Sequence, residues 1–284
     1  MDASDPTTAR PEEPTGRPAA RPGTRSSNWA AEVFTDHVIG ELGLAVAADG
    51  DRVLGRAEVV PELCVPGTDA LRTSVILTWA DVLAGTVTGN AMVPRIPLTL
   101  DIEVRVARPA GPGTVVTADA APVRAGRSVV VSECWFRDEA GGEPLALAVA
   151  TFVPAPDPTH VFPDGFPVPE GPGRPLAVPL AERLDCRVVE PGVAEMPRRR
   201  DALNAVGAIQ GGLVAVALEE AAASLWPTPT PLESLTVRYL RPVTQGPARA
   251  TATAAADVAT VRLSDVGTGK LCLFATATPA RADR

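Results

Sequence analysis

The stretch that decides the fold is Asn204–Trp226, NAVGAIQGGLVAVALEEAAASLW. It begins with an asparagine, reaches the glycine pair Gly211 and Gly212, and continues as an apolar run that contains Glu219 and Glu220. The spacing of its apolar residues and the lack of proline predict a helix. A helix that is apolar on nearly every face has to be enclosed by other elements. The stretch therefore predicts a helix wrapped by a sheet.

The same pattern occurs earlier in the chain. Leu71–Asn90, LRTSVILTWADVLAGTVTGN, is a second apolar helical run. Each run is followed by a V-R-x-x-R-P motif, at 104–109 and at 237–242, and then by β-branched segments separated by glycine-containing turns. The repeated order predicts two similar units, each an apolar helix followed by an antiparallel meander of strands.

Proline marks the boundary between the two units. Nine of the 30 prolines lie within 154–179, which rules out a helix or a central strand there and favours an extended linker. The tail over 1–28 is rich in Pro, Ala and Arg, and we expect it to be disordered. We therefore expect a first domain over 29–153, the linker over 154–179 and a second domain over 180–281.

The composition excludes several classes of protein. A net charge of −8 and an aromatic content of 4% argue against a nucleic-acid-binding surface. The chain has no apolar run of the length that a membrane helix needs and no secretory signal at its N-terminus, so we expect a cytoplasmic protein. The cysteines are widely spaced, without a C-x-x-C motif, so we expect neither a metal site nor disulfides; they are Cys64, Cys134, Cys186 and Cys272.

Three features together resemble a known family. These are N-x5-[HQ]-G-G at 204–212, a carboxylate nine residues after Gln210, and a strand ending V-x-Y-x-R-P at 237–242. They resemble the hotdog-fold acyl-CoA thioesterases of the PaaI-like group, and two such units in one chain resemble a double hotdog. The resemblance implies an α+β fold, a tandem (double) hotdog in which each half is a long apolar helix wrapped by an antiparallel β-sheet.

The resemblance also implies a function. We expect hydrolysis of an acyl-CoA or acyl-carrier thioester with no metal or redox cofactor, and no nucleic-acid or membrane partner. A homodimer of double hotdogs is left open. Two alternatives remain: a catalytically silent protein that binds acyl thioesters, and a hotdog hydratase or dehydratase, which would need His37 or His160 beside a carboxylate.

Helix geometry decides which carboxylate serves the glycine pair. The first N–H groups of a helix lack partners and carry the positive end of its dipole, so Gly211 can hold a developing oxyanion. Glu219 lies eight residues further on, about 12 Å along the same helix, and cannot reach it. If the two helices pack antiparallel, the facing carboxylate is Asp81, the only charged residue between Arg72 and Arg95.

The resemblance assigns roles to these positions. Asp81 is the expected nucleophile or general base, Gly211 the oxyanion donor, and Asn204 a ligand of the thioester carbonyl or of the attacking water. Gln210 and Gly212 are expected to contact the substrate, with Gln210 in place of the commoner histidine. The alternatives are that the glycines only allow close packing, that Asn204 is a turn residue, and that Asp81 is a structural cap.

The reciprocal site has lost the motif. Arg72 occupies the position that matches Gln210, and Thr73 and Ser74 replace the glycines. We therefore expect one competent site per chain, with Glu219 or Glu220 structural and paired with Arg72; if the helices were not antiparallel, Glu219 would be the catalytic carboxylate.

A short basic run precedes the Asn204 loop. Arginine side chains suit the phosphates of coenzyme A or an acidic carrier protein, although a solvated loop is the plainer interpretation. The run consists of Arg198, Arg199 and Arg200.

Overall fold

A computed structural model of the chain describes residues 37–162, 174–226 and 229–281. The tail expected over 1–28 and the central part of the expected linker, 163–173, lie outside the described residues.

The first unit begins with a short helix and a hairpin, places one long helix across the sheet, and ends with four strands. Proline at the first position of its 3-10 turn fits the preference for proline at helix starts. The elements are α2 (Val38–Glu41), β1 (Ala45–Asp49), β2 (Arg52–Glu58), η1 (Pro61–Leu63), α3 (Thr73–Met92), β3 (Pro97–Val106), β4 (Val115–Ala125), β5 (Val130–Asp138) and β6 (Pro144–Pro154).

The second unit repeats this order element by element. Its strands show the same alternation of buried and exposed residues, as in β10, where every second residue of the first six is buried. The elements are α4 (Leu180–Arg183), β7 (Arg187–Glu190), β8 (Val193–Met196), η2 (Arg200–Ala202), α5 (Gly211–Ala223), β9 (Leu232–Tyr239), β10 (Ala248–Ala255), β11 (Val258–Asp265) and β12 (Lys270–Pro279).

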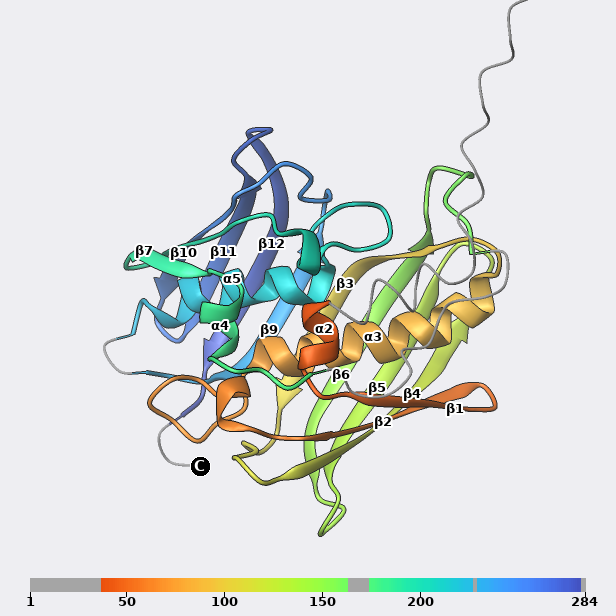
Figure 1. Ribbon diagram of the computed structural model, residues 1–284, viewed down its shortest axis with the longest axis horizontal. Coiled ribbons are helices and arrows are strands. Elements are labelled where there is room, and N and C mark those ends of the chain that lie inside the picture. The colour runs from red at the N-terminus through yellow and green to blue at the C-terminus, as the bar shows by residue number, and fades with distance from the viewer. Residues whose placement is uncertain (1–36, 163–173, 227–228, 282–284) are drawn as a thin grey trace, which may run out of the picture.

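The twelve strands of the described residues form one antiparallel sheet with a symmetric order, β1-β2-β4-β5-β6-β3-β9-β12-β11-β10-β8-β7. The two units meet at its centre, where β3 pairs with β9 and Ile102 lies opposite Val237. The two long helices lie against the same side of this sheet (Figure 1). The expected double hotdog is therefore confirmed.

The two helices pack antiparallel. Gly212, at the start of α5, lies beside Thr78 of α3, and Glu219, further along α5, lies beside Thr73 and Ser74 at the start of α3. Both helices are buried along nearly their whole length, as their uniformly apolar sequences predict. No helix within the described residues is long and apolar enough to cross a membrane.

The short elements before each long helix were not anticipated from the sequence. The hairpin of β1 and β2 contains Gly50, Asp51 and several exposed residues, so its apolar pattern is short and weak. It joins the sheet by pairing β2 with β4, a contact between segments about sixty residues apart in the chain. Such a strand owes its existence to a long-range partner, which local periodicity does not reveal.

Candidate functional site

The Asp81 carboxylate of α3 lies against the start of α5. Its Oδ1 accepts a hydrogen bond from Thr99 Oγ1 at 2.8 Å, and its Oδ2 accepts one from Gln210 Nε2 at 2.5 Å. The backbone N–H of Gly212 also donates to the carboxylate. The contact between Asp81 and the 210–212 segment agrees with the antiparallel packing expected from helix geometry.

This carboxylate is poised to change protonation near neutral pH. Burial raises the pKa of Asp81 to about 6, although the hydrogen bonds from Thr99, Gln210 and Gly212 each favour the charged form. The residue as a whole is 9% exposed. A carboxylate with this pKa is ionised in most molecules at pH 7 and still basic enough to take a proton.

The start of α5 is built by Gln210 and the glycine pair. Gln210 Oε1 caps the helix by accepting from Leu213 N–H at 2.8 Å, while its Nε2 is the group that holds Asp81. Gly211 is the first helical residue, and no described residue accepts a hydrogen bond from its N–H. This donor, at the positive end of the helix, is free for a ligand.

The two glycines differ in what they allow. A Cβ on Gly212 would lie 2.6 Å from Thr78 Cα, so only glycine lets the helices approach this closely. A Cβ on Gly211 would lie 3.4 Å from Asp81 Oδ2 and 3.3 Å from the Tyr239 ring. Gly212 therefore serves packing as well as holding Asp81, whereas Gly211 faces the carboxylate directly.

A cavity of about 410 Å³ opens beside these groups. Asp81 and Gly211 both line it, together with residues from both units, and most of the remaining lining is apolar. Its size and lining suit a small ligand with an apolar chain. Leu98, Phe152, Phe162, Ile209, Val214 and Leu273 supply much of the apolar wall.

Asn204 also lines this cavity, but its side-chain oxygen is used by the loop. Oδ1 accepts from Val206 N–H at 3.1 Å and from Ala208 N–H at 3.0 Å, which makes the 204–208 segment an Asx-type turn. The structure thus gives Asn204 the turn role that was the alternative expectation. A contact with substrate through its amide nitrogen stays a prediction.

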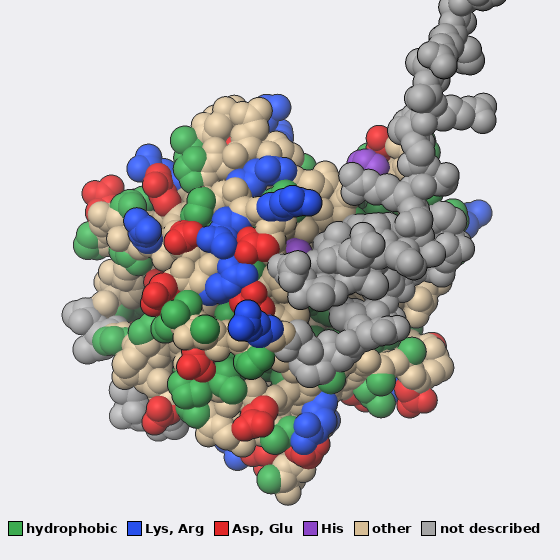
Figure 2. Space-filling model, in the orientation of Figure 1, with side chains coloured by type: hydrophobic (Ala, Val, Ile, Leu, Met, Phe, Trp, Pro, Cys, Tyr) green, Lys and Arg blue, Asp and Glu red, His purple; other side chains and the backbone are tan. Residues whose placement is uncertain are grey.

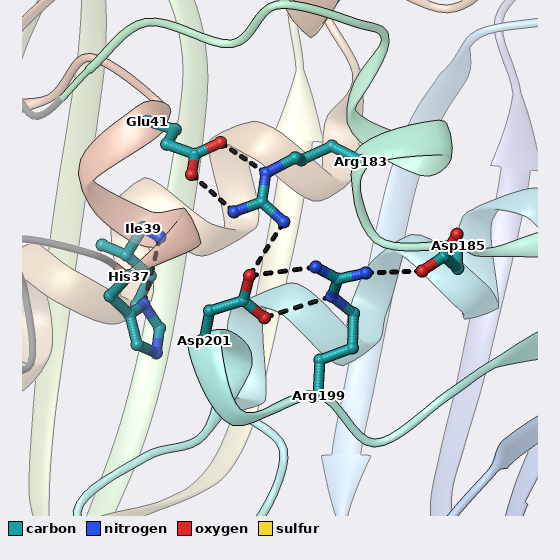
Figure 3. Close-up of polar contacts among 7 residues, drawn as sticks. All are labelled: His37, Ile39, Glu41, Arg183, Asp185, Arg199 and Asp201. Carbon is teal, nitrogen blue, oxygen red and sulfur yellow. Dashed lines mark hydrogen bonds and ion pairs between the residues drawn. The ribbon is translucent and has the colours of Figure 1, made fainter.

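The basic run before this loop is mostly engaged in holding it. Arg199 bonds Asp185 and Asp201, and Arg183 bonds both Asp201 and Glu41, so α2, α4 and η2 form one ion-paired cluster (Figure 3). Acidic and basic side chains alternate on the face that holds α4 (Figure 2). Three hydrogen bonds tie the Arg199 guanidinium to Asp185 and Asp201, so Arg199 holds the loop; a contact of Arg199 with substrate stays a prediction.

Its neighbours in the run are differently placed. Arg198 donates to Gly207 O at 2.8 Å, and both Arg198 and Arg200 are exposed to solvent. Contacts of these two arginines with a ligand stay predictions.

His37 lies in the same cavity, which sequence reasoning did not foresee. Its Nδ1 accepts from Ile39 N–H at 3.1 Å, so the ring proton is on Nε2, which donates to Leu203 O at 3.0 Å. Burial lowers the pKa of His37 and favours this neutral form. With both nitrogens engaged, His37 fixes the backbone just before Asn204 and lends no support to the hydratase alternative.

The start of α3 shows why the reciprocal site is closed. Glu219 Oε1 accepts from Thr73 N–H at 2.9 Å, and its Oε2 accepts from Ser74 Oγ and lies 3.3 Å from Arg72 Nη1. Arg72 also pairs with Glu220 at 2.7 Å. The expected pairing of these glutamates with Arg72 is confirmed. Glu219, one methylene longer than aspartate, occupies the helix-start N–H that would otherwise face a substrate.

Two further residues of the site escaped sequence reasoning. Thr99 holds Asp81, and Tyr239 donates from its hydroxyl to Gly211 O at 3.0 Å. Burial, together with the nearby Asp81 charge, raises the pKa of Tyr239, so it stays a neutral donor. Tyr239 belongs to the V-x-Y-x-R-P motif and was a readable signal, whereas Thr99 had none. Within the described ranges, no cluster of His, Cys, Asp and Glu could hold a metal ion.

Comparisons with known proteins bear on the fold and on one segment of the chain. Residues 73–145 match the family model of the thioesterase superfamily, while no curated protein sequence matches the chain. The 12:0-ACP thioesterase from Umbellularia californica is 13% identical over 82% of this chain and 99% of its own, with a TM-score of 0.57. An acyl-ACP thioesterase from Bacteroides thetaiotaomicron is 10% identical over 81% and 98%, with a TM-score of 0.59.

The two structural likenesses establish the shared fold across both units, and the family match concerns the helix and strands of the first unit. The family match over this segment supports thioester hydrolase activity. Residues 73–145 therefore resemble the thioesterase superfamily, and the chain as a whole has the double hotdog fold.

Proposed function

We propose that the chain hydrolyses acyl thioesters at one site, built from Asp81 of the first unit and the 204–212 segment of the second. The observation that carries this proposal is a buried carboxylate with a pKa of about 6, held at the start of a helix and lining a mainly apolar cavity. The cavity takes the acyl chain, and the thioester carbonyl lies against the free N–H of Gly211.

The reaction proceeds by general-base attack of water. Asp81 takes a proton from the water as its oxygen bonds to the carbonyl carbon, and the oxyanion is held by Gly211 N–H and the helix dipole. When the tetrahedral intermediate collapses, the C–S bond breaks and the thiolate takes the proton from Asp81. The products are the free acid and the thiol, and the carboxylate is regenerated.

Both carboxylate oxygens of Asp81 already accept hydrogen bonds, which favours the general-base role over direct attack. A single turnover in heavy-oxygen water tests the general-base step. Attack by water places the label in the released acid, whereas attack by Asp81 through an anhydride leaves the label in the protein when water attacks the aspartyl carbon. An unlabelled acid would refute the general-base mechanism but would leave the proposed hydrolase activity standing.

The test of the function is thiol release from a panel of acyl-CoA and acyl-carrier thioesters. We expect Asp81→Asn to lower the rate roughly a hundredfold to ten-thousandfold, the range that a general base contributes. Glu219→Gln is the matched control, because Glu219 is the corresponding residue of the closed site. We expect it to keep the rate, with the melting temperature of each variant as a check on folding.

Two results would contradict this assignment. A full rate in Asp81→Asn with a lost rate in Glu219→Gln would move the active site to the other helix start. Binding of thioesters without thiol release would favour the silent binder. The same panel distinguishes the thiol carriers. The expected phosphate contacts are Arg241, which is exposed and lines the cavity, and the exposed Arg198 and Arg200 before the 204–212 segment.

A further inference from the structure

A second cavity, of about 330 Å³, lies near the start of α3. Its inner wall consists of apolar residues that are almost fully buried, so it reaches into the core instead of lying flat on the surface. Its volume is within the roughly 300–1,000 Å³ typical of ligand sites. This inner wall includes Leu71, Ile76, Val116, Phe136, Leu145 and Leu232.

The second cavity occupies the position in its unit that the site cavity occupies in the other. The motif segment 106–110 lines the second cavity, and the matching segment 239–243 lines the first. In the same way, Leu71 and Ile76 correspond to Ile209 and Val214 by their distance from the helix start.

The strand ladders extend this correspondence to the opposite wall. Arg105 pairs with Leu147, and its counterpart Arg238 pairs with Phe274. Val153 lies six residues after Leu147, and Ala280 lies six residues after Phe274. Val153 lines the site cavity, and Ala280 lines the second cavity. The two cavities are therefore equivalent in construction, and an apolar chain that fits one has a related space in the other.

The second cavity lacks the groups for hydrolysis. The carboxylate that would serve it, Glu219, is 1% exposed and bound to Arg72 and to Thr73 N–H. Leu232 takes the strand position that corresponds to Thr99, the residue that holds Asp81. A ligand in this cavity therefore meets neither a free Glu219 carboxylate nor a free Thr73 N–H.

The mouth of the second cavity carries charge suited to an anion. Arg108 lines it, with its side chain 48% exposed and one long ion pair, 3.6 Å to Asp138. Arg281 also lines the cavity, and Glu233 is the one acidic residue among its lining residues within the described chain. Because the single contact with Asp138 leaves further guanidinium donors, Arg108 can receive a carboxylate or phosphate.

We propose that this second cavity binds an acyl chain with an anionic end, without hydrolysing it, and that Arg108 holds the anion. The anionic end is either the carboxylate of a free fatty acid or the phosphate-bearing part of an acyl thioester. The chain thus has two acyl sites, one for turnover and one for binding alone.

Calorimetric titration counts the sites, with decanoate and decyl-CoA thioether as ligands that cannot be hydrolysed. Ala107 is exposed at the second mouth, and Leu240 is its counterpart at the first, so Ala107→Trp and Leu240→Trp form a matched pair. We expect two equivalents per wild-type chain for at least one ligand and one equivalent for each variant. Arg108→Gln should weaken the second site roughly tenfold to hundredfold.

We expect Ala107→Trp to remove the second equivalent of decanoate or of the thioether. The ligand that loses it shows whether the anionic end is a fatty-acid carboxylate or the phosphate-bearing part of an acyl thioester. An unchanged stoichiometry in Ala107→Trp, or a single equivalent in the wild type that only Leu240→Trp removes, would overturn the proposal. Should Ala107→Trp fail to fold, Arg108→Gln decides alone, because an unchanged affinity at both sites refutes the anion contact. Thiol release measured in parallel separates this proposal from the hydrolase, since Ala107→Trp should retain it.

Discussion

The close approach of the two helices at Gly212 predicts a large effect from the smallest substitution, Gly212→Ala. The added Cβ would lie 2.6 Å from Thr78 Cα, and ordinary contact begins at 3.4 Å, so the start of α5 has to move by the 0.8 Å difference. Overpacking of this kind costs about 1–3 kcal/mol, offset by about 1 kcal/mol for replacing a helical glycine with alanine. We therefore expect the free energy of unfolding to fall by up to about 2 kcal/mol.

The rate should suffer more than the stability. The same movement changes the position of Gly211 N–H relative to the Asp81 carboxylate. A misplacement of catalytic groups by about 1 Å costs on the order of a hundredfold in rate. Thiol release and thermal unfolding of purified Gly212→Ala measure the two effects, with Gly141→Ala as control, because a Cβ there meets only the flexible Glu143 side chain at 3.7 Å. A wild-type rate in folded Gly212→Ala would refute the idea that this contact sets the site geometry.

Two further predictions concern protons. Thr99→Val removes a hydrogen bond that favours ionised Asp81, so the pKa of Asp81 should rise from about 6 and the acid limb of the kcat/KM profile should move to higher pH; an unmoved limb would exclude Asp81 as the titrating base. For Asp265, burial raises the pKa, but backbone N–H donors including Gln245 and Thr244 outweigh it and the net pKa is lowered. Ionised Asp265 therefore stabilises the fold above the unfolded pKa of about 3.9, and this contribution is lost as pH falls through the folded pKa. Asp265→Asn should be less stable than wild type at neutral pH and should lose less stability in acid. Urea unfolding at several pH values measures both effects.

The features that sequence reasoning captured are those with a local or repeated signal. Both long helices, the meanders that follow them and the pairing of units were readable from apolar runs and the repeated motif. Helix rise excluded Glu219, because a carboxylate eight residues along the same helix cannot reach its start, and the assumption of antiparallel packing then placed Asp81 there. The proposed chemistry of these residues stays a prediction.

What escaped it depends on contacts between distant segments. Thr99 is one β-branched residue among many until the β3 strand places it against α3, and His37 gains its role only when α2 packs near Leu203. The same holds for Arg199: its basic run predicts ligand contacts, and only the structure shows the ion pairs with Asp185 and Asp201 that tie it to the loop.

Joining both units in one chain has a consequence for how this site can change over time. In a two-fold symmetric dimer of identical units, every substitution enters both sites at once, so a helix start could not exchange its glycines without disabling the whole assembly. In this chain Arg72 and Glu219 interact at the start of α3, whereas Gln210 and Asp81 interact at the start of α5. Because the two units are separate stretches of one chain, a substitution in one unit leaves the other unchanged. The unit without the proposed active site is therefore free to acquire a different ligand.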